Sequence, residues 1–216
     1  MRINRFVALA TGMSRRAADK LIESGQVIVN GQTAEAGTPA DDSDSVSLDG
    51  QRLRLPENPL IIILNKPVGY VCSRNGQGGK TIYDLLPPEL RMLKPVGRLD
   101  KDSSGLLLLT NDGVLAHKLT HPSFQKEKIY EVELDKPLAP EDKVAIEHGV
   151  RLDDGPSKFN LQGSNKTWQV KMHEGRNRQI RRTFASLGYT VTKLHRTHFG
   201  AYMLNSLTPG AHKIVK

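Results

Sequence analysis

The chain has 216 residues, with 31 Lys and Arg against 23 Asp and Glu and a formal net charge of +8. The length suits one ordinary domain with a small additional module, and the charge favours a polyanionic partner such as nucleic acid. The longest apolar runs, residues 61–64 and 106–109, are too short to cross a bilayer, and the single cysteine, Cys72, allows neither an internal disulfide nor a cysteine-based metal site. We therefore expect a cytoplasmic protein with no membrane contact.

The first part of the chain predicts a small module of two helices followed by short strands. Apolar residues fall at helical spacing over residues 3–10, and Ser14 is a suitable N-cap for a second helix that ends at Gly25. Strands are expected at residues 27–29 and 46–53, each beside an Asn-Gly or Asp-Gly turn. The module therefore has the order helix, turn, helix, hairpin.

Residues 55–59, Leu-Pro-Glu-Asn-Pro, combine two prolines with an absence of periodicity. They predict a linker between a domain over residues 1–54 and a second domain over residues 60–216. In the second domain, strands are expected at residues 60–64, 106–109, 129–134 and 168–172, and helices at residues 81–86, 114–119, 140–148 and 178–187. This order predicts an α+β fold with a mainly antiparallel mixed sheet flanked by helices.

Three segments of the second domain place polar side chains beside apolar structure. Residues 97–113, GRLDKDSSGLLLLTNDG, put Arg98 and Asp100 before a buried strand, where an aspartate most often forms a hydrogen-bonded turn. Tyr130 lies in an alternating strand, where a tyrosine usually packs half-buried. Residues 174–200, beginning EGRNRQIRR, predict a basic loop and an amphipathic helix whose arginines could simply face solvent.

Taken together, these segments resemble the motifs of the RsuA-like and RluA-like pseudouridine synthases. The resemblance implies that Asp100 in Gly-Arg-Leu-Asp is the catalytic aspartate and that Tyr130 lies against the target uracil. It also implies that Arg181 pairs with Asp100 and that Ile180 makes an apolar contact to the base. Arg98 is placed to fill the space that a flipped-out uridine leaves in the RNA. Whether Asp100 attacks the base or removes a ribose proton stays open.

The N-terminal module resembles an S4 RNA-binding domain, and an S4 domain before this catalytic domain is the order seen in RsuA-like ribosomal RNA enzymes. The resemblance implies site-specific isomerisation of uridine to pseudouridine by a monomer without metal or organic cofactor, in 16S or 23S ribosomal RNA or a pre-ribosomal particle. Basic residues of the module match the RNA-facing surface of S4 domains, and further RNA contacts are expected from the basic segment and from the end of the first buried strand. These residues are Arg2, Arg5, Arg15, Arg16 and Lys20 in the module, Arg176, Asn177, Arg178, Gln179 and Arg182 in the segment, and Lys66, which is expected to contact a phosphate.

Other functions are less well supported by the residues. A non-catalytic S4-containing RNA-binding or ribosome-assembly protein would be expected to lose at least one of Asp100, Tyr130 and Arg181. The run Gly-Gln-Gly-Gly-Lys-Thr lacks the first glycine of a phosphate-binding loop, because Arg74 stands in its place. His195 and His198 could share a helix face but have no further metal ligands near them in the sequence.

Overall fold

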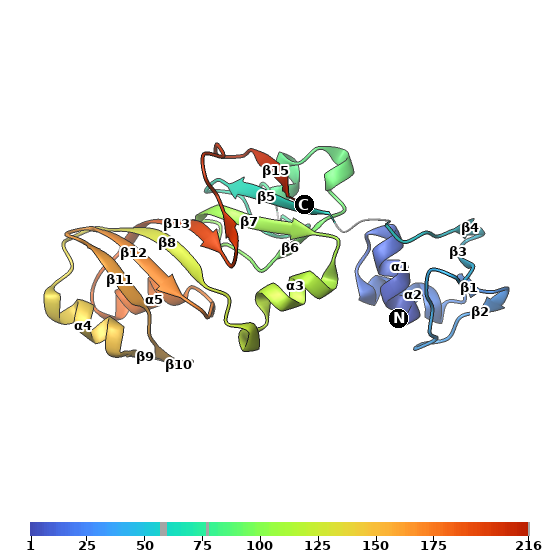
Figure 1. Ribbon diagram of the computed structural model, residues 1–216, viewed down its shortest axis with the longest axis horizontal. Helices are drawn as coiled ribbons and strands as arrows, with labels where there is room; N and C mark the ends of the chain where they lie inside the picture. The colour runs from blue at the N-terminus through green and yellow to red at the C-terminus, as the bar shows by residue number, and fades with distance from the viewer. Residues whose placement is uncertain (57–59, 77, 216) are drawn as a thin grey trace. The chain divides into compact units, whose positions relative to one another are not determined.

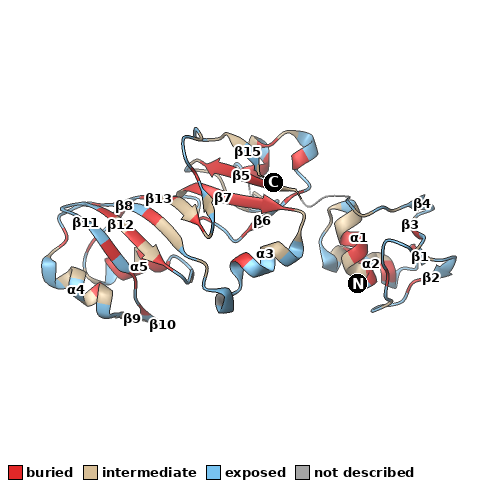
Figure 2. Ribbon diagram, in the orientation of Figure 1, coloured by how far each residue is buried: buried red, intermediate tan, exposed pale blue. Residues whose placement is uncertain are grey.

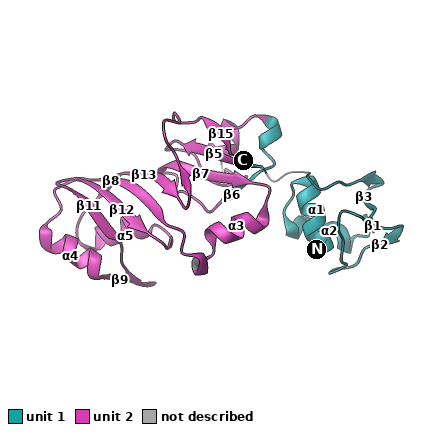
Figure 3. Ribbon diagram, viewed as in Figure 1, with its two compact units in different colours: residues 1–60, 88–94 teal, residues 61–87, 95–216 magenta. Residues whose placement is uncertain are grey.

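The computed structural model describes residues 1–56, 60–76 and 78–215, which form two compact units (Figure 3). Residues 1–60 and 88–94 make the first unit, and residues 61–87 and 95–216 make the second. Residues 57–59, inside the predicted linker 55–59, lie outside the described residues. The sequence placed residues 88–94 in the second domain. In the structure they belong with the first unit, where Lys94 Nζ donates a hydrogen bond to the carbonyl oxygen of Met13 at 2.8 Å.

The first unit packs two helices on a small antiparallel sheet (Figure 1). Ser14 caps the second helix by accepting a hydrogen bond from the backbone nitrogen of Ala17, as its position predicts. Ile3, Phe6 and Val46 are among the side chains of its core. The elements are α1 (Ile3–Thr11), α2 (Arg15–Glu23), β1 (Val27–Val29), β2 (Gln32–Thr33), β3 (Val46–Leu48) and β4 (Gln51–Arg52), with the strand order β2-β1-β3-β4.

The second unit is built on a large mixed sheet whose central strands are mostly buried (Figure 2). The strand order is β11-β12-β8-β13-β7-β5-β15, and β14 and β6 pair with β13 and β7. The pairing of β13 with β7 is parallel, whereas the other pairings along this order are antiparallel. The strands are β5 (Ile61–Lys66), β6 (Lys94–Val96), β7 (Ser104–Thr110), β8 (Lys128–Leu134), β11 (Asn160–Ser164), β12 (Thr167–Met172), β13 (Val191–Phe199), β14 (Tyr202–Met203) and β15 (His212–Val215), with a separate hairpin of β9 (Val150–Leu152) and β10 (Gly155–Ser157). The predicted α+β class and mainly antiparallel mixed sheet are confirmed.

Helices α3 (Gly113–Thr120), α4 (Pro140–His148) and α5 (Gln179–Ser186) agree with the sequence to within one residue at each end. The helix predicted over residues 81–86 is instead a short 3₁₀ helix, η1 (Ile82–Leu85), because Leu86 precedes a proline and is extended. Further 3₁₀ turns are η2 (Pro88–Leu90) and η3 (Pro122–Phe124). Strand β13 was not predicted, and it is the strand that joins the two halves of the sheet.

Candidate active site

A cavity of about 630 Å³ opens in the second unit where the loop after β6, strand β8 and the start of α5 meet. Asp100, Tyr130 and Ile180 all line it, as does Arg98. Tyr130 and Ile180 are 7% and 4% exposed, whereas the side chain of Asp100 is 34% exposed. The structure therefore brings a partly accessible carboxylate together with an aromatic ring and an aliphatic side chain.

One row of paired residues runs across the sheet and brings Arg196 and Tyr130 to the wall of this cavity. Lys66 of β5 pairs with Gly105 of β7, Gly105 with Arg196 of β13, and Arg196 with Tyr130 of β8. Paired residues in a sheet carry their side chains on the same face. Gly105 has a φ of 105° and an added Cβ would lie 2.6 Å from the backbone nitrogen of Arg196, so the close approach of β7 and β13 requires a glycine here.

Lys66 anchors the loop that carries Asp100. Its side chain is fully buried, and Nζ donates hydrogen bonds to the carbonyl oxygens of Pro67 at 3.1 Å, Asp100 at 3.0 Å and Ser103 at 2.7 Å. Burial lowers the pKa of the Lys66 amine. The expectation that Lys66 contacts a phosphate is therefore wrong, because its ammonium group has three main-chain acceptors inside the protein and no access to solvent.

Arginines from the start of α5 gather around Asp102 rather than Asp100. Arg178 donates two hydrogen bonds of 2.9 Å to the carboxylate of Asp102, and its Nη1 lies 3.7 Å from Asp100 Oδ2. Arg181 Nη2 donates to the carbonyl oxygen of Asp102 at 2.7 Å, and its Nε lies 3.3 Å from Asp102 Oδ2. The hydrogen bonds from Arg178 hold the pKa of Asp102 below its usual value. The expected ion pair of Arg181 with Asp100 is thus replaced, among the described residues, by a pair with Asp102.

The rest of the basic segment also makes intramolecular bonds. Arg176 donates to the carboxylate of Asp154 at 2.8 Å and to the carbonyl oxygen of Pro156 at 2.6 Å, and Arg182 forms an ion pair of 2.6 Å with Asp154. Gln179 is 3% exposed and donates to Glu174 and to the hydroxyl of Ser157. These three residues fix the β9–β10 hairpin against α5 through Asp154, Pro156 and Ser157, and their expected contacts with RNA stay a prediction.

Several predicted RNA contacts remain accessible. Arg98 and Asn177 are exposed on the cavity rim, and Arg178 is exposed although it is paired. In the first unit the expected RNA-facing set, Arg2, Arg5, Arg15, Arg16 and Lys20, is exposed or half-buried, and no ion pair joins it to a carboxylate in the part of the chain that the structure describes.

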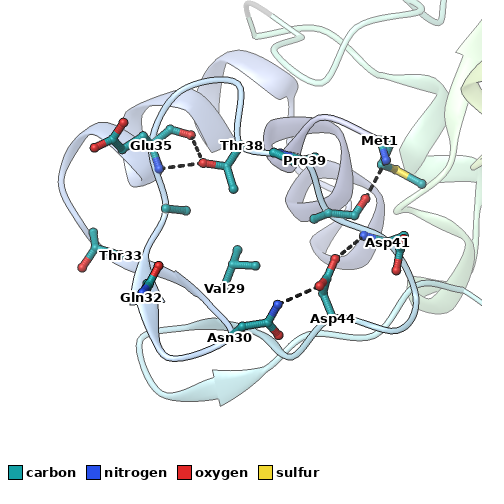
Figure 4. A pocket seen from close by; sticks show the side chains of 12 residues that line it. Met1, Val29, Asn30, Gln32, Thr33, Glu35, Thr38, Pro39, Asp41 and Asp44 are labelled. Carbon is teal, nitrogen blue, oxygen red and sulfur yellow. Dashed lines mark hydrogen bonds between the residues drawn. The ribbon is translucent and has the colours of Figure 1, made fainter.

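The first unit has a cavity of its own, about 590 Å³, of different character (Figure 4). Glu35, Asp41 and Asp44 are among its lining residues, and Asn30 donates a hydrogen bond of 2.7 Å to Asp44. Hydrogen bonds within the loops, such as the one from the Asp41 nitrogen to Asp44, occupy several of these polar groups. Its acidic lining makes it a poor site for a phosphate backbone.

Within residues 1–56, 60–76 and 78–215, no group of three or more His, Cys, Asp and Glu side chains could hold a metal ion. His195 and His198 lie on β13 rather than on a helix, and their Nδ1 atoms contact Ser104 Oγ and Thr197 Oγ1, each at 2.9 Å. In the same described ranges, every helix is too short or too polar to cross a bilayer.

Sequence reasoning missed residues whose role depends on pairing across the chain. The motif points to Asp100 and gives no role to Asp102, and Arg196 is one of several basic residues in its stretch of the sequence. Alternation around Tyr130 predicts which face of β8 is buried, but not that Arg196 lies beside it. The register of β13 against β8 reveals Arg196 as the neighbour of Tyr130, and the side-chain hydrogen bonds of Arg178 reveal the role of Asp102.

Residues 60–186 match the RNA pseudouridylate synthase family, and residues 1–46 match the S4 domain. A Bacillus subtilis (strain 168) protein named ribosomal large subunit pseudouridine synthase B is 37% identical over 97% of this chain and 89% of its own length. A Pseudomonas aeruginosa (strain PAO1) protein of the same name is 39% identical over 93% of this chain and 55% of its own length. The solved structure described as "Crystal structure of pseudouridylate synthase" superposes with a TM-score of 0.73 at 32% identity, covering 100% of this chain and 96% of that one.

The fold and the matches define an RNA-modifying isomerase with an N-terminal S4 domain. The chain belongs to the RNA pseudouridylate synthase family.

Proposed function

We propose that this protein isomerises one uridine of large-subunit ribosomal RNA to pseudouridine, with Asp100 as the catalytic carboxylate. The observation that carries the proposal is the placement of Asp100 on a cavity whose other walls include the Tyr130 ring and Ile180. A flat apolar surface beside a carboxylate suits a pyrimidine ring extruded from its stack. The choice of the large subunit follows the names of the relatives from Bacillus subtilis and Pseudomonas aeruginosa.

The reaction breaks the bond between ribose C1′ and uracil N1 and forms a bond between C1′ and C5. The proton on C5 is lost and N1 gains one, so no oxidant or reductant is needed. Asp100 starts the exchange, either by adding to the base or by removing a ribose proton. Tyr130 and Ile180 hold the detached ring in place and keep water from C1′, and Arg98 on the rim fills the space left in the RNA.

Mapping of pseudouridine in ribosomal RNA from cells with and without this gene tests the proposal. We expect one site in the large-subunit RNA to disappear and to return with the wild-type gene but not with Asp100→Asn. A site lost from transfer RNA alone would overturn the substrate. No lost site in any RNA would favour the non-catalytic binding protein.

A further inference from the structure

Arg196 is a buried cation on the cavity that the proposed steps leave unused. It is 2% exposed and lines the same cavity as Asp100. Its Nε donates a hydrogen bond of 2.8 Å to the carbonyl oxygen of Leu106. Its Nη2 is buried and has no hydrogen-bond partner among the described residues, and no carboxylate there lies within ion-pair distance of it.

A buried guanidinium without an anion is costly, so its presence needs an explanation. Each of the other arginines on this cavity except Arg98 has a carboxylate partner: Arg176 pairs with Asp154 and Arg178 with Asp102. Two aromatic rings partly offset the cost of burying the Arg196 charge. Its Cζ lies 4.9 Å from the ring centroid of Phe199 and 6.0 Å from that of Tyr130. Such contacts stabilise the positive charge but give Nη2 no hydrogen-bond acceptor.

The sheet holds Arg196 beside the residue expected to contact the base. Arg196 and Tyr130 are cross-strand partners, and Gly105 lets β7 approach the backbone of Arg196 from the other side. The amine of Lys128 lies 5.3 Å from the centroid of the Phe199 ring, which Arg196 also contacts. Burial and the charge of Arg196 lower the pKa of this amine. Two basic side chains, Lys128 and Arg196, therefore lie on this wall of the cavity.

The chemistry of the proposed reaction supplies the missing anion. When the bond between C1′ and N1 breaks, its electron pair stays on the uracil ring and spreads over N1 and the two carbonyl oxygens. Addition of Asp100 to the base would also place negative charge on a carbonyl oxygen. Under either route, the reacting base is most negative when it is detached, and a fixed buried donor then acts most strongly.

We propose, on the basis of the function proposed above, that the Arg196 guanidinium donates a hydrogen bond to a carbonyl oxygen of the uracil and stabilises the negative charge that develops on the detached base. The guanidinium contributes little to RNA affinity, because the ground-state uracil is neutral. It contributes mainly to the rate of the chemical step.

Single-turnover kinetics of Arg196→Gln and Arg196→Lys on a ribosomal RNA fragment containing the mapped uridine test this role. We expect Arg196→Gln to slow the chemical step roughly 100-fold or more, as loss of one such donor does in other enzymes, while the dissociation constant of the RNA changes by only a few fold. Arg196→Lys keeps the charge with a shorter reach, so its rate should lie between those of wild type and Arg196→Gln.

Lys193→Gln is the matched control, because it removes one positive charge from the same strand at an exposed position paired with Glu131. It should react at the wild-type rate. Circular dichroism and thermal unfolding monitor the fold of each variant. If Arg196→Gln does not fold, Arg196→Lys carries the test, and a slowed chemical step at unchanged affinity supports the role.

Two results would overturn it. A folded Arg196→Gln or Arg196→Lys variant that reacts at the wild-type rate removes the need for the donor. A variant that loses RNA affinity in proportion to its rate shows a binding or structural role instead. Failure of the wild-type protein to modify any ribosomal RNA fragment would contradict the proposed function itself, and so differs from failure of a variant alone.

Discussion

Asp100 and Asp102 lie two residues apart in one loop, yet their surroundings give them different chemistry. Asp102 accepts two hydrogen bonds from Arg178 and lies 3.3 Å from Nε of Arg181, which commits its carboxylate to the protein. Asp100 has Arg178 only at 3.7 Å and opens onto the cavity. An aspartate that acts on substrate needs this freedom, because a carboxylate already saturated with hydrogen bonds is a weak nucleophile and a weak base.

Asp100→Asn should therefore abolish pseudouridine formation while the dissociation constant of the RNA stays within a few fold, because the amide keeps the shape and loses the charge. Single-turnover assays and filter binding measure the two quantities. Asp153→Asn, an exposed change of the same kind, serves as the control. Measurable turnover by Asp100→Asn would exclude Asp100 as the catalyst.

Lys66→Met should destabilise the fold and slow the reaction without altering the salt dependence of RNA binding. The change removes the ammonium donor from the carbonyl oxygens of Pro67, Asp100 and Ser103, and we expect the free energy of unfolding to fall by about 2 kcal/mol or more. Urea unfolding measures this, with exposed Lys101→Met as the control. If the stability were unchanged and the salt dependence of RNA binding became weaker, Lys66 would be shown to contact a phosphate.

At the scale of elements, the approach of β7 to β13 depends on one glycine. Gly105→Ala would place a methyl group against the backbone of Arg196 at a positive φ, and the combined strain should cost roughly 2–4 kcal/mol. Gly113→Ala, at the start of α3 with nothing within 4 Å, is the matched control and should be neutral. Thermal and urea unfolding of the two variants decide the point, and equal stabilities would contradict it.

The loop before β7 is joined to α5 by a charge interaction that depends on pH. Arg178 lowers the pKa of Asp102 from its usual 3.8, so the pair contributes its full stability above that value and loses it as the pH falls through the lowered pKa. Asp102→Asn should therefore be less stable than wild type at neutral pH, with a difference that shrinks below roughly pH 5. Urea unfolding across this range measures the effect. A difference that stays constant into acid would assign the loss to packing instead.

For the whole molecule, the accessible cations of the first unit should govern RNA affinity. If Arg2, Arg5, Arg15, Arg16 and Lys20 each meet a phosphate of single-stranded RNA, they contribute roughly −3.5 to the slope of log K against log salt. Replacing all five with glutamine should flatten the slope by that amount and leave the single-turnover rate at saturating protein nearly unchanged. Fluorescence anisotropy at several salt concentrations measures the slope. An unchanged slope would move the RNA surface elsewhere.

Local patterns in the sequence were enough to predict helices α1 to α5 and strands such as β5, β7, β8 and β12, but not β6, β9 to β11 or β13 to β15. Helix α4 follows from its proline start, and β8 and β12 follow from alternation, because these depend on neighbours in the chain. Asp100, Tyr130 and Ile180 followed from resemblance to known motifs, and the structure brings them to one cavity.

The partners of the charged groups were decided only by the tertiary structure. Sequence identifies a basic segment but cannot say whether an arginine faces RNA or a carboxylate far along the chain, as Arg178 faces Asp102 and Arg182 faces Asp154. The buried positions of Lys66 and Arg196 likewise depend on the register of β5, β7, β13 and β8. The energy of a charge pair depends on the distance between the two groups in space. Here that distance is set by the pairing of strands that lie far apart in the sequence. Composition and periodicity describe only neighbouring residues, so they carry no information on which strands pair.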